Sequence, residues 1–161
     1  MDETLDFIRR ELRYRLGLAD DEVTLDNART LSRASDTRGV VITLVNVGVS
    51  TYQGSVLKQP GWQDLLELVV LFSFRFPHYK TSLVHLNKTM QLLYSKPAYT
   101  AADSHPDNPF PTGLERMMFT LSPLDFSALR DLWGMLGDAQ VPSVVYNVRM
   151  VQTRTPVIPA Q

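Results

Sequence analysis

Residues 65–76 read LLELVVLFSFRF, and this apolar run decides how the rest of the chain must fold. If the run is a β-strand, successive side chains point to opposite faces of a sheet. One face then holds Leu66, Leu68, Val70, Phe72, Phe74 and Phe76, and the other holds Glu67, Val69, Leu71, Ser73 and Arg75. The first face is wholly apolar, so we predict a central strand that packs under helices. The second face is mixed and is expected to be half covered or to contact a partner.

Apolar spacing places further elements on both sides of this strand. Helices are expected between Asp2 and Gly17, after Pro77, and between Ser122 and Gly137. The buried side of the second helix is predicted to hold Leu83, Leu86, Met90 and Leu93. Other strands are expected at residues 40–49, 117–121 and 143–151, with a short one at 23–25. The pattern predicts an α/β (α+β) domain over residues 1–151, with a loose tail over 152–161.

In this fold, a single mixed sheet of about four to five strands packs with three helices. The third helix is well marked at its start, because Ser122 is a good N-cap and Pro123 suits the first helical position. Its apolar stripe is Phe126, Leu129, Trp133 and Leu136. We therefore predict a structural core that includes Phe126, Leu129, Trp133 and, from the last strand, Tyr146.

The segment over residues 96–113 contains four prolines and shows neither helix nor strand period. It is expected to be a long loop or an extended arm. Tyr99 and Phe110 are large apolar groups in this otherwise polar stretch, and such groups often anchor an interface. Two interpretations remain open: either the rings contact a partner, or they fold back onto their own subunit.

Composition sets limits on the class of protein. The 161 residues carry a net charge of -1, which argues against a main role in neutralising phosphates, so no nucleic-acid partner is expected. The chain contains no cysteine, which excludes disulfides and thiolate chemistry. The charged N-terminus has no apolar signal-peptide core, and the run at 65–76 is too short to span a bilayer. We expect a soluble protein without direct membrane insertion.

The sequence offers little that could perform chemistry. His78 and His85 lie seven residues apart, but no third ligand has a convincing spacing for a metal site. Residues 103–108 alternate oxygen ligands, yet a calcium loop needs Gly and Glu where Asn108 and Leu114 stand. Nucleophile-elbow, zinc-protease and phosphate-loop motifs are absent. We therefore expect no catalytic, cofactor-binding or metal site and no enzymatic activity, although a triad built from distant residues is not excluded by sequence.

Three segments together resemble a known family: VVITLVNVGV (40–49), LLELVVLFSFRFPHYKTSLVHLNKTMQLLY (65–94) and LSPLDFSALRDLWGMLGDAQVPSVVYNVRMV (121–151). The most specific feature is the helix end from Trp133 to Gly137, followed by Pro142-Ser143, Tyr146 and Arg149. The chain resembles the N-terminal domain family of tail-terminator or cap proteins from phage-tail-like contractile injection systems.

This resemblance implies a structural cap. Such a protein forms a six-fold ring on the last layer of the inner tube, ends tube polymerisation and anchors the last layer of the sheath. Its expected partners are further copies of itself and the tube and sheath proteins. It would be assembled in a bacterial or archaeal cytoplasm and then occupy the distal end of the particle. The candidate partner contacts are Tyr99, Phe110, Glu67, Arg75 and Arg149. The alternative is a small α/β scaffold or binding module of another oligomeric assembly.

Overall fold

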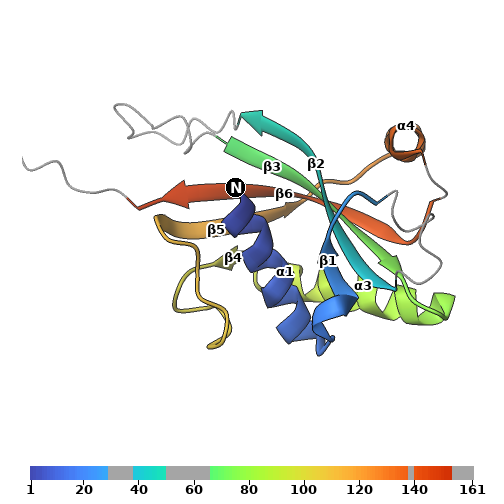
Figure 1. The fold of residues 1–161 in the computed structure, drawn as a ribbon. Coiled ribbons are helices and arrows are strands. Elements are labelled where there is room, and N and C mark those ends of the chain that lie inside the picture. Colours follow the sequence, from blue (N-terminus) through green and yellow to red (C-terminus); the bar gives the residue numbers. More distant parts are fainter. Residues whose placement is uncertain (29–37, 50–65, 138–139, 154–161) are drawn as a thin grey trace, which may run out of the picture.

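The computed structural model describes residues 1–28, 38–49, 66–137 and 140–153 of the chain. It contains the helices α1 (Asp2–Leu16), α3 (Tyr79–Ser95) and α4 (Phe126–Leu136) and the 3-10 turn η1 (Asp20–Glu22). The strands are β1 (Val23–Leu25), β2 (Gly39–Val49), β3 (Leu66–Arg75), β4 (Ala98–Tyr99), β5 (Leu114–Leu121) and β6 (Ser143–Gln152). They form one twisted sheet in the order β1-β2-β3-β6-β5-β4 (Figure 1). Only β1 and β2 are parallel, so the sheet is mixed.

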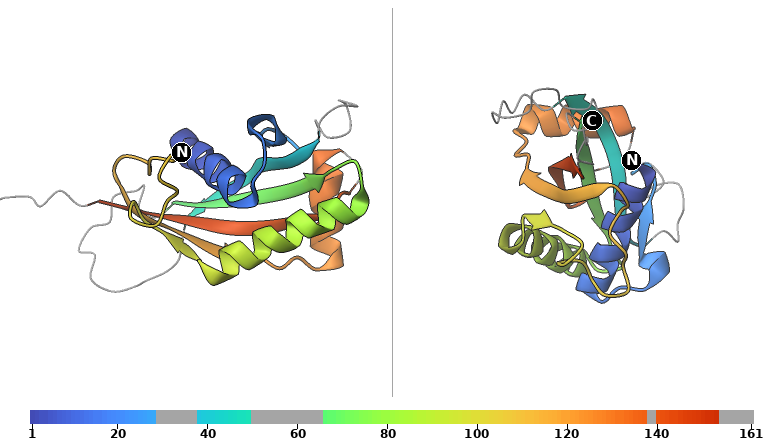
Figure 2. Two further views of the ribbon diagram at one scale, coloured as in Figure 1. Left: turned by 90° about the horizontal axis from the view of Figure 1, so that it is seen from below. Right: turned by 90° about the vertical axis from the view of Figure 1, so that its left-hand side faces the viewer.

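The helices cover both faces of the sheet. α1 and α3 lie side by side on one face, and α4 crosses the opposite face near one end (Figures 1 and 2). The larger core lies between the sheet and the α1–α3 pair, and a smaller core lies under α4. The predicted fold class is therefore confirmed, as are the three α-helices.

The alternating side chains of β3 form one apolar and one mixed face, as predicted. Its apolar face is buried in the larger core, and β3 lies between β2 and β6 in the middle of the sheet. On the mixed face, Leu71 is buried and Val69 is partly buried in the smaller core under α4. Glu67 and Arg75, near the two ends of β3, are half-buried. The mixed face is thus half covered, and a helix of the same chain provides the cover.

The sheet has six described strands, one more than predicted at most. The additional strand is β4, a two-residue strand that pairs with Met117 and Met118 of β5. Pro97 breaks the local pattern, yet its carbonyl accepts a hydrogen bond from the Phe119 amide at 2.7 Å and brings β4 into register. So short a pairing has no periodic signal in the sequence.

Gly39 is required where β1 and β2 meet. Its φ of 113° lies in a region that side-chain-bearing residues rarely adopt. A Cβ at this position would lie 2.1 Å from the carbonyl oxygen of Glu22. The close backbone approach lets Val23 pair with Val40 at the start of the parallel ladder.

The helix α4 begins later than predicted. Asp125, and not Ser122, is the N-cap, because its carboxylate accepts a hydrogen bond from the Ala128 amide at 2.7 Å. The Ser122 amide donates to the Val145 carbonyl at 2.9 Å, which keeps the chain extended beside β6. Two residues in this segment are good N-caps, and the tertiary hydrogen bond of Ser122 decides between them.

The predicted buried side of α3 is correct for Leu93 and for Leu86, which packs partly buried on the larger core, but wrong for Leu83. Ser82, Thr89 and Leu93 are buried, whereas Leu83 is exposed. The hydroxyl of Ser82 accepts a hydrogen bond from the Phe76 amide at 2.9 Å, and that of Thr89 donates to the His85 carbonyl at 2.9 Å. Because both hydroxyls are satisfied, Ser82 and Thr89 can face the core beside Leu86, Leu92 and Leu93.

Candidate functional site

Part of the segment over residues 96–113 folds against α1. Asn108 is buried, and its Nδ2 donates to the Phe7 carbonyl at 3.2 Å and to Glu11 Oε2 at 2.9 Å. Its Oδ1 accepts a hydrogen bond from Arg10 Nε at 2.9 Å. The His105 amide also donates to Glu11 Oε2, at 3.0 Å. We refer to this set of hydrogen bonds as the α1 latch, and it fixes the segment to its own subunit.

The two aromatic rings of this segment belong to the core. Tyr99 is 1% exposed and lies edge-on to Phe119, with ring centroids 5.8 Å apart. Phe110 lies edge-on to Phe7 at 5.1 Å and packs on the larger core. Of the two open interpretations, the structure therefore supports the one in which the rings fold back. Tyr99 and Phe110 are corrected from candidate partner contacts to packing residues, because each ring finds an apolar partner within the subunit.

Burial has an electrostatic consequence for Tyr99. It raises the pKa of the Tyr99 phenol to about 12, because the charged phenolate is poorly solvated there. The hydroxyl is buried and has no hydrogen-bond partner among the described residues. Both observations indicate a packing role for the ring and not proton transfer.

The structure brings two of the remaining interface candidates together. Glu67 on β3 and Arg149 on β6 lie directly opposite each other, and Gly48 of β2 flanks Glu67 on its other side. Arg75 lies at the far end of β3, opposite Gly39. All three charged side chains are half-buried. Glu67 and Arg149 can thus form one polar site on the sheet, whereas Arg75 cannot join it; their role toward partners stays a prediction.

The helix α4 contains both a confirmed and a wrong core assignment. Trp133 is 4% exposed and packs in the smaller core, to which Leu129 adds a partly buried side chain. Phe126, predicted in the same stripe, is 92% exposed. It is the first residue of α4. Tyr146 is buried as predicted and lies edge-on to Phe72, with ring centroids 6.0 Å apart.

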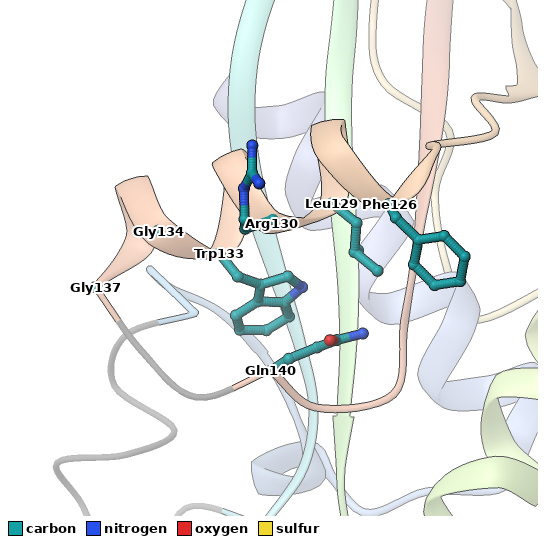
Figure 3. Close-up of a pocket in the computed structure, with 7 residues that line it drawn as sticks. All are labelled: Phe126, Leu129, Arg130, Trp133, Gly134, Gly137 and Gln140. Atoms are coloured by element: carbon teal, nitrogen blue, oxygen red, sulfur yellow. The ribbon is translucent and has the colours of Figure 1, made fainter.

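A shallow pocket lies beside α4. Trp133 and Leu129 form its apolar wall, Gln140 closes it from the chain that leads to β6, and Phe126 stands at its end (Figure 3). Arg130 also lines the pocket but points the opposite way from Trp133 (Figure 3), and it donates local hydrogen bonds to Ser127 and Asp131. The exposed ring of Phe126 and the partly exposed Leu129 form an apolar surface that could meet another protein.

The outer side of α3 is a second exposed surface. Tyr94 is 90% exposed, and Leu83 and Val84 are also exposed. Two lysines, Lys80 and Lys88, are interspersed with them, and the helix contains no acidic residue. An apolar groove continues from Tyr94 between α3 and β5. This surface was not predicted, because the helix period placed Leu83 in the core; the absence of acidic residues from the helix was the available signal in the sequence.

The turn η1 and the strand β1 form an acidic edge of the sheet. Within residues 20–26 there are four acidic residues and no basic one: Asp20, Asp21, Glu22 and Asp26. Asp20 accepts hydrogen bonds from Arg9 at 3.0 Å and Arg13 at 2.6 Å. The Arg9 guanidinium, and then that of Arg13, lowers the pKa of Asp20. Glu22 accepts a hydrogen bond from the Ala19 amide at 2.8 Å and Asp26 from the Asn27 amide at 2.6 Å, and Asp21 and Asp26 are exposed.

The candidate metal ligands of the described residues do not form a metal-binding cluster. In residues 1–28, 38–49, 66–137 and 140–153, no three His, Asp or Glu side chains gather as a metal site would require. His85 stacks on Phe76 with ring centroids 4.3 Å apart, and burial lowers its pKa. Over the same ranges, no helix combines the length and hydropathy needed to cross a bilayer.

Comparison with solved structures places the fold. The PVC sheath/tube terminator of an extracellular contractile injection system, in its extended state, matches 100% of the chain with a TM-score of 0.58 and 16% identity. The tube terminating cap of the anti-feeding prophage matches 100% of the chain with a TM-score of 0.61 and 12% identity. The chain spans 61% of the first of these proteins and 60% of the second. At these identities the likeness establishes a shared fold.

Sequence comparison defines the family. No curated protein sequence is significantly similar to the chain. The family described as the Pvc16 N-terminal domain, however, matches residues 3–161, which is nearly the whole chain. This protein therefore belongs to the Pvc16 N-terminal domain family.

Proposed function

We propose that the protein is the cap, or tail terminator, of a contractile phage-tail-like injection system. The observation that carries the proposal is that the whole chain aligns with two proteins that end the tube of such particles. One of them is a sheath/tube terminator and the other a tube terminating cap. On this proposal the protein lies at the distal end of the particle, stops addition of tube subunits and holds the last layer of sheath.

A structural, non-enzymatic role is part of the proposal. Perturbed pKa values often mark catalytic groups, but here each has a structural cause. Asp20 pairs with two arginines, Asp103 accepts from Thr100 and pairs with Lys96, and Tyr99 is buried among apolar side chains. The buried carboxylate of Glu11 is occupied by Arg15, His105 and Asn108. These groups hold the fold, and their partners leave them little freedom for chemistry.

The proposed assembly is a hexameric ring built from this domain. A ring needs head-to-tail contacts, in which each subunit uses two different complementary surfaces. The chain offers several exposed surfaces that its own elements leave uncovered: the α4 pocket, the outer side of α3 and the acidic edge at β1. The ring would assemble in the cytoplasm with the tube and sheath, without nucleic acid and without membrane insertion.

Cryo-electron microscopy of particles tests the location. A tag on the exposed Met1 should appear at one end of each particle only, and at the end of the tube. Labels distributed along the sheath, or labels absent from purified particles, would contradict the proposal.

Deletion of the gene tests the mechanism. A terminator contributes binding energy only at the growing end, so particles that lack it should vary in length or fail to hold an extended sheath. The wild-type chain, supplied in trans, should restore a single length. Uniform particles in the deletion strain would contradict a terminating role.

A further inference from the structure

We infer that neighbouring copies in the ring meet through two specific surfaces of this domain, the outer face of α3 and the acidic edge. The inference rests on the proposed function, because it assumes a ring of identical subunits. We define the α3 face as Lys80, Leu83, Val84, Lys88, Gln91 and Tyr94. The acidic edge is Asp21, Glu22, Leu25 and Asp26. The occupant of the α3 face is thus a second copy of this chain.

The α3 face combines positive charge with exposed apolar groups. All six side chains are exposed, and helical spacing places them on one side of the helix. Neither Lys80 nor Lys88 forms an ion pair with any described residue of the chain. Leu83, Val84 and Tyr94 would be unusual on a surface that only meets water, since such groups together form an apolar patch. This face calls for a partner that carries both carboxylates and an apolar side chain.

The acidic edge has this complementary character. Leu25 is 39% exposed at the end of β1, and Asp21 and Asp26 are exposed close to it in the sequence. β1 is the outermost strand of the sheet, and no described strand pairs with its other side. A cluster of like charges steers association toward the opposite charge, even where each exposed pair contributes little affinity.

The two surfaces lie on different sides of one subunit. α1 contacts α3, and it also contacts η1 and β1, so it lies between the two surfaces. Figure 2 (right) shows α3 on one side of the molecule and η1 with β1 on the other. One subunit therefore cannot satisfy both surfaces by itself. A contact between unlike surfaces repeats from copy to copy, and it forms a ring when the rotation closes.

Cysteine cross-linking tests this contact directly, because the natural chain contains no cysteine. Val84→Cys and Leu25→Cys are placed together in one chain, and a short bis-maleimide is applied to purified protein and to particles. The expected product is a ladder of cross-linked species that ends at the size of the ring. The matched control joins Val84→Cys with Ser127→Cys, an exposed position on α4, and should give no ladder. Either single-cysteine variant should also stay uncross-linked.

Four outcomes would overturn the inference. Dimers of the Val84→Cys single variant would mean that α3 meets α3. Cross-links from α3 to tube or sheath proteins would assign the α3 face to those partners. A ring without the 25–84 cross-link, or a protein that gives no cross-link in solution or in particles, would exclude the contact.

Charge reversal provides a second test. Lys80→Glu with Lys88→Glu should weaken self-association at least about tenfold, because like charges would then face each other. Folding should be preserved, since Lys80 lies in the first turn of α3, where a carboxylate is favourable. Adding Asp21→Lys and Asp26→Lys to the same chain should restore association, as measured by light scattering. Absence of rescue in variants with wild-type melting temperatures would contradict the contact.

The two proposals can fail separately. If the cross-linked ring forms but particles lack it, the contact stands and the role as a cap is wrong. If the protein caps the tube and the 25–84 cross-link is absent, the role stands and the contact is wrong.

Discussion

Asn108 donates a hydrogen bond to the buried carboxylate of Glu11 at 2.9 Å, between positions that are 97 residues apart in the chain. The bond joins the first helix to a loop that precedes β5. Glu11 also accepts from Arg15 Nε at 2.9 Å and from the His105 amide at 3.0 Å, so the carboxylate has three donors. A buried carboxylate is tolerated only when it is paired and hydrogen-bonded in this way.

Asn108→Ala should therefore destabilise the domain by about 2–3 kcal/mol, because it removes hydrogen bonds to a charged group and leaves buried acceptors unsatisfied. Urea denaturation checks this value. Thr112→Ala, an exposed change in the same segment, should stay within about 0.5 kcal/mol of wild type. Equal stabilities for the two variants would show that the α1 latch does not hold the loop.

The hydrogen bond between Asn108 and Glu11 also shows which parts of the structure could not be predicted from the sequence. The alternation in β3 is local, so its buried face could be predicted from a dozen residues. Glu11 alone reads as a solvated helix residue, and Asn108 alone reads as part of a proline-rich turn. The two residues become hydrogen-bond partners only in the folded chain. Their bond fixes the segment, which was expected to be a long loop or an extended arm, as a loop against α1.

The surfaces were harder to predict than the core. The helix period allowed Leu83 to be buried, but Ser82, whose hydroxyl accepts from the Phe76 amide, and Thr89 face the core, and Leu83 is exposed. Likewise, Phe126 fits the period of α4 but lies at its first residue. In both cases the exposure of the side chain depends on how the helix lies on the sheet, and the local sequence pattern does not contain this information. The expected tail over residues 152–161 lies largely outside the described residues, which end at Thr153.

Tyr99 should make stability depend on alkaline pH. Its pKa is about 12 in the folded protein, against an ordinary value of 10.0, so the unfolded chain loses this proton first. Stability from this group is complete below about pH 10 and falls as the pH rises toward 12, by up to about 2–3 kcal/mol. Denaturant titrations at a series of pH values measure the fall. Because other groups titrate in the same pH range, the contribution of Tyr99 is identified by comparing the pH dependence of stability in wild type with that in a variant without the phenol.

Tyr99→Phe is that variant. It removes the titrating phenol and also an unpartnered buried hydroxyl, so its stability near neutral pH should equal or exceed that of wild type. Its alkaline loss should be smaller than that of wild type. An identical pH profile would show that Tyr99 is not the group responsible.

Gly39→Ala should destabilise the domain strongly, by roughly 2 kcal/mol or more, because the new methyl group would collide with the Glu22 carbonyl at a strained φ. Gly48→Ala on the same strand is the matched control. Among the described residues its added Cβ meets only the Glu67 carbonyl oxygen, at 3.9 Å, so the change should cost less than about 1 kcal/mol. Thermal unfolding of both variants separates a local clash from a general intolerance of β2.

Trp133 and Phe126 provide a matched pair on α4, because they share the helix but differ in environment. Trp133→Ala should cost about 3–5 kcal/mol, since it empties the centre of the smaller core. Phe126→Ala should change stability by less than about 0.5 kcal/mol, since the ring is 92% exposed. If the pocket beside Phe126 meets the tube or sheath, Phe126→Ala should impair capping while the melting temperature stays within a few degrees of wild type. If particles with Phe126→Ala are normal, α4 has only a packing role. If the variant instead loses much of its stability, Phe126 packs in the core after all.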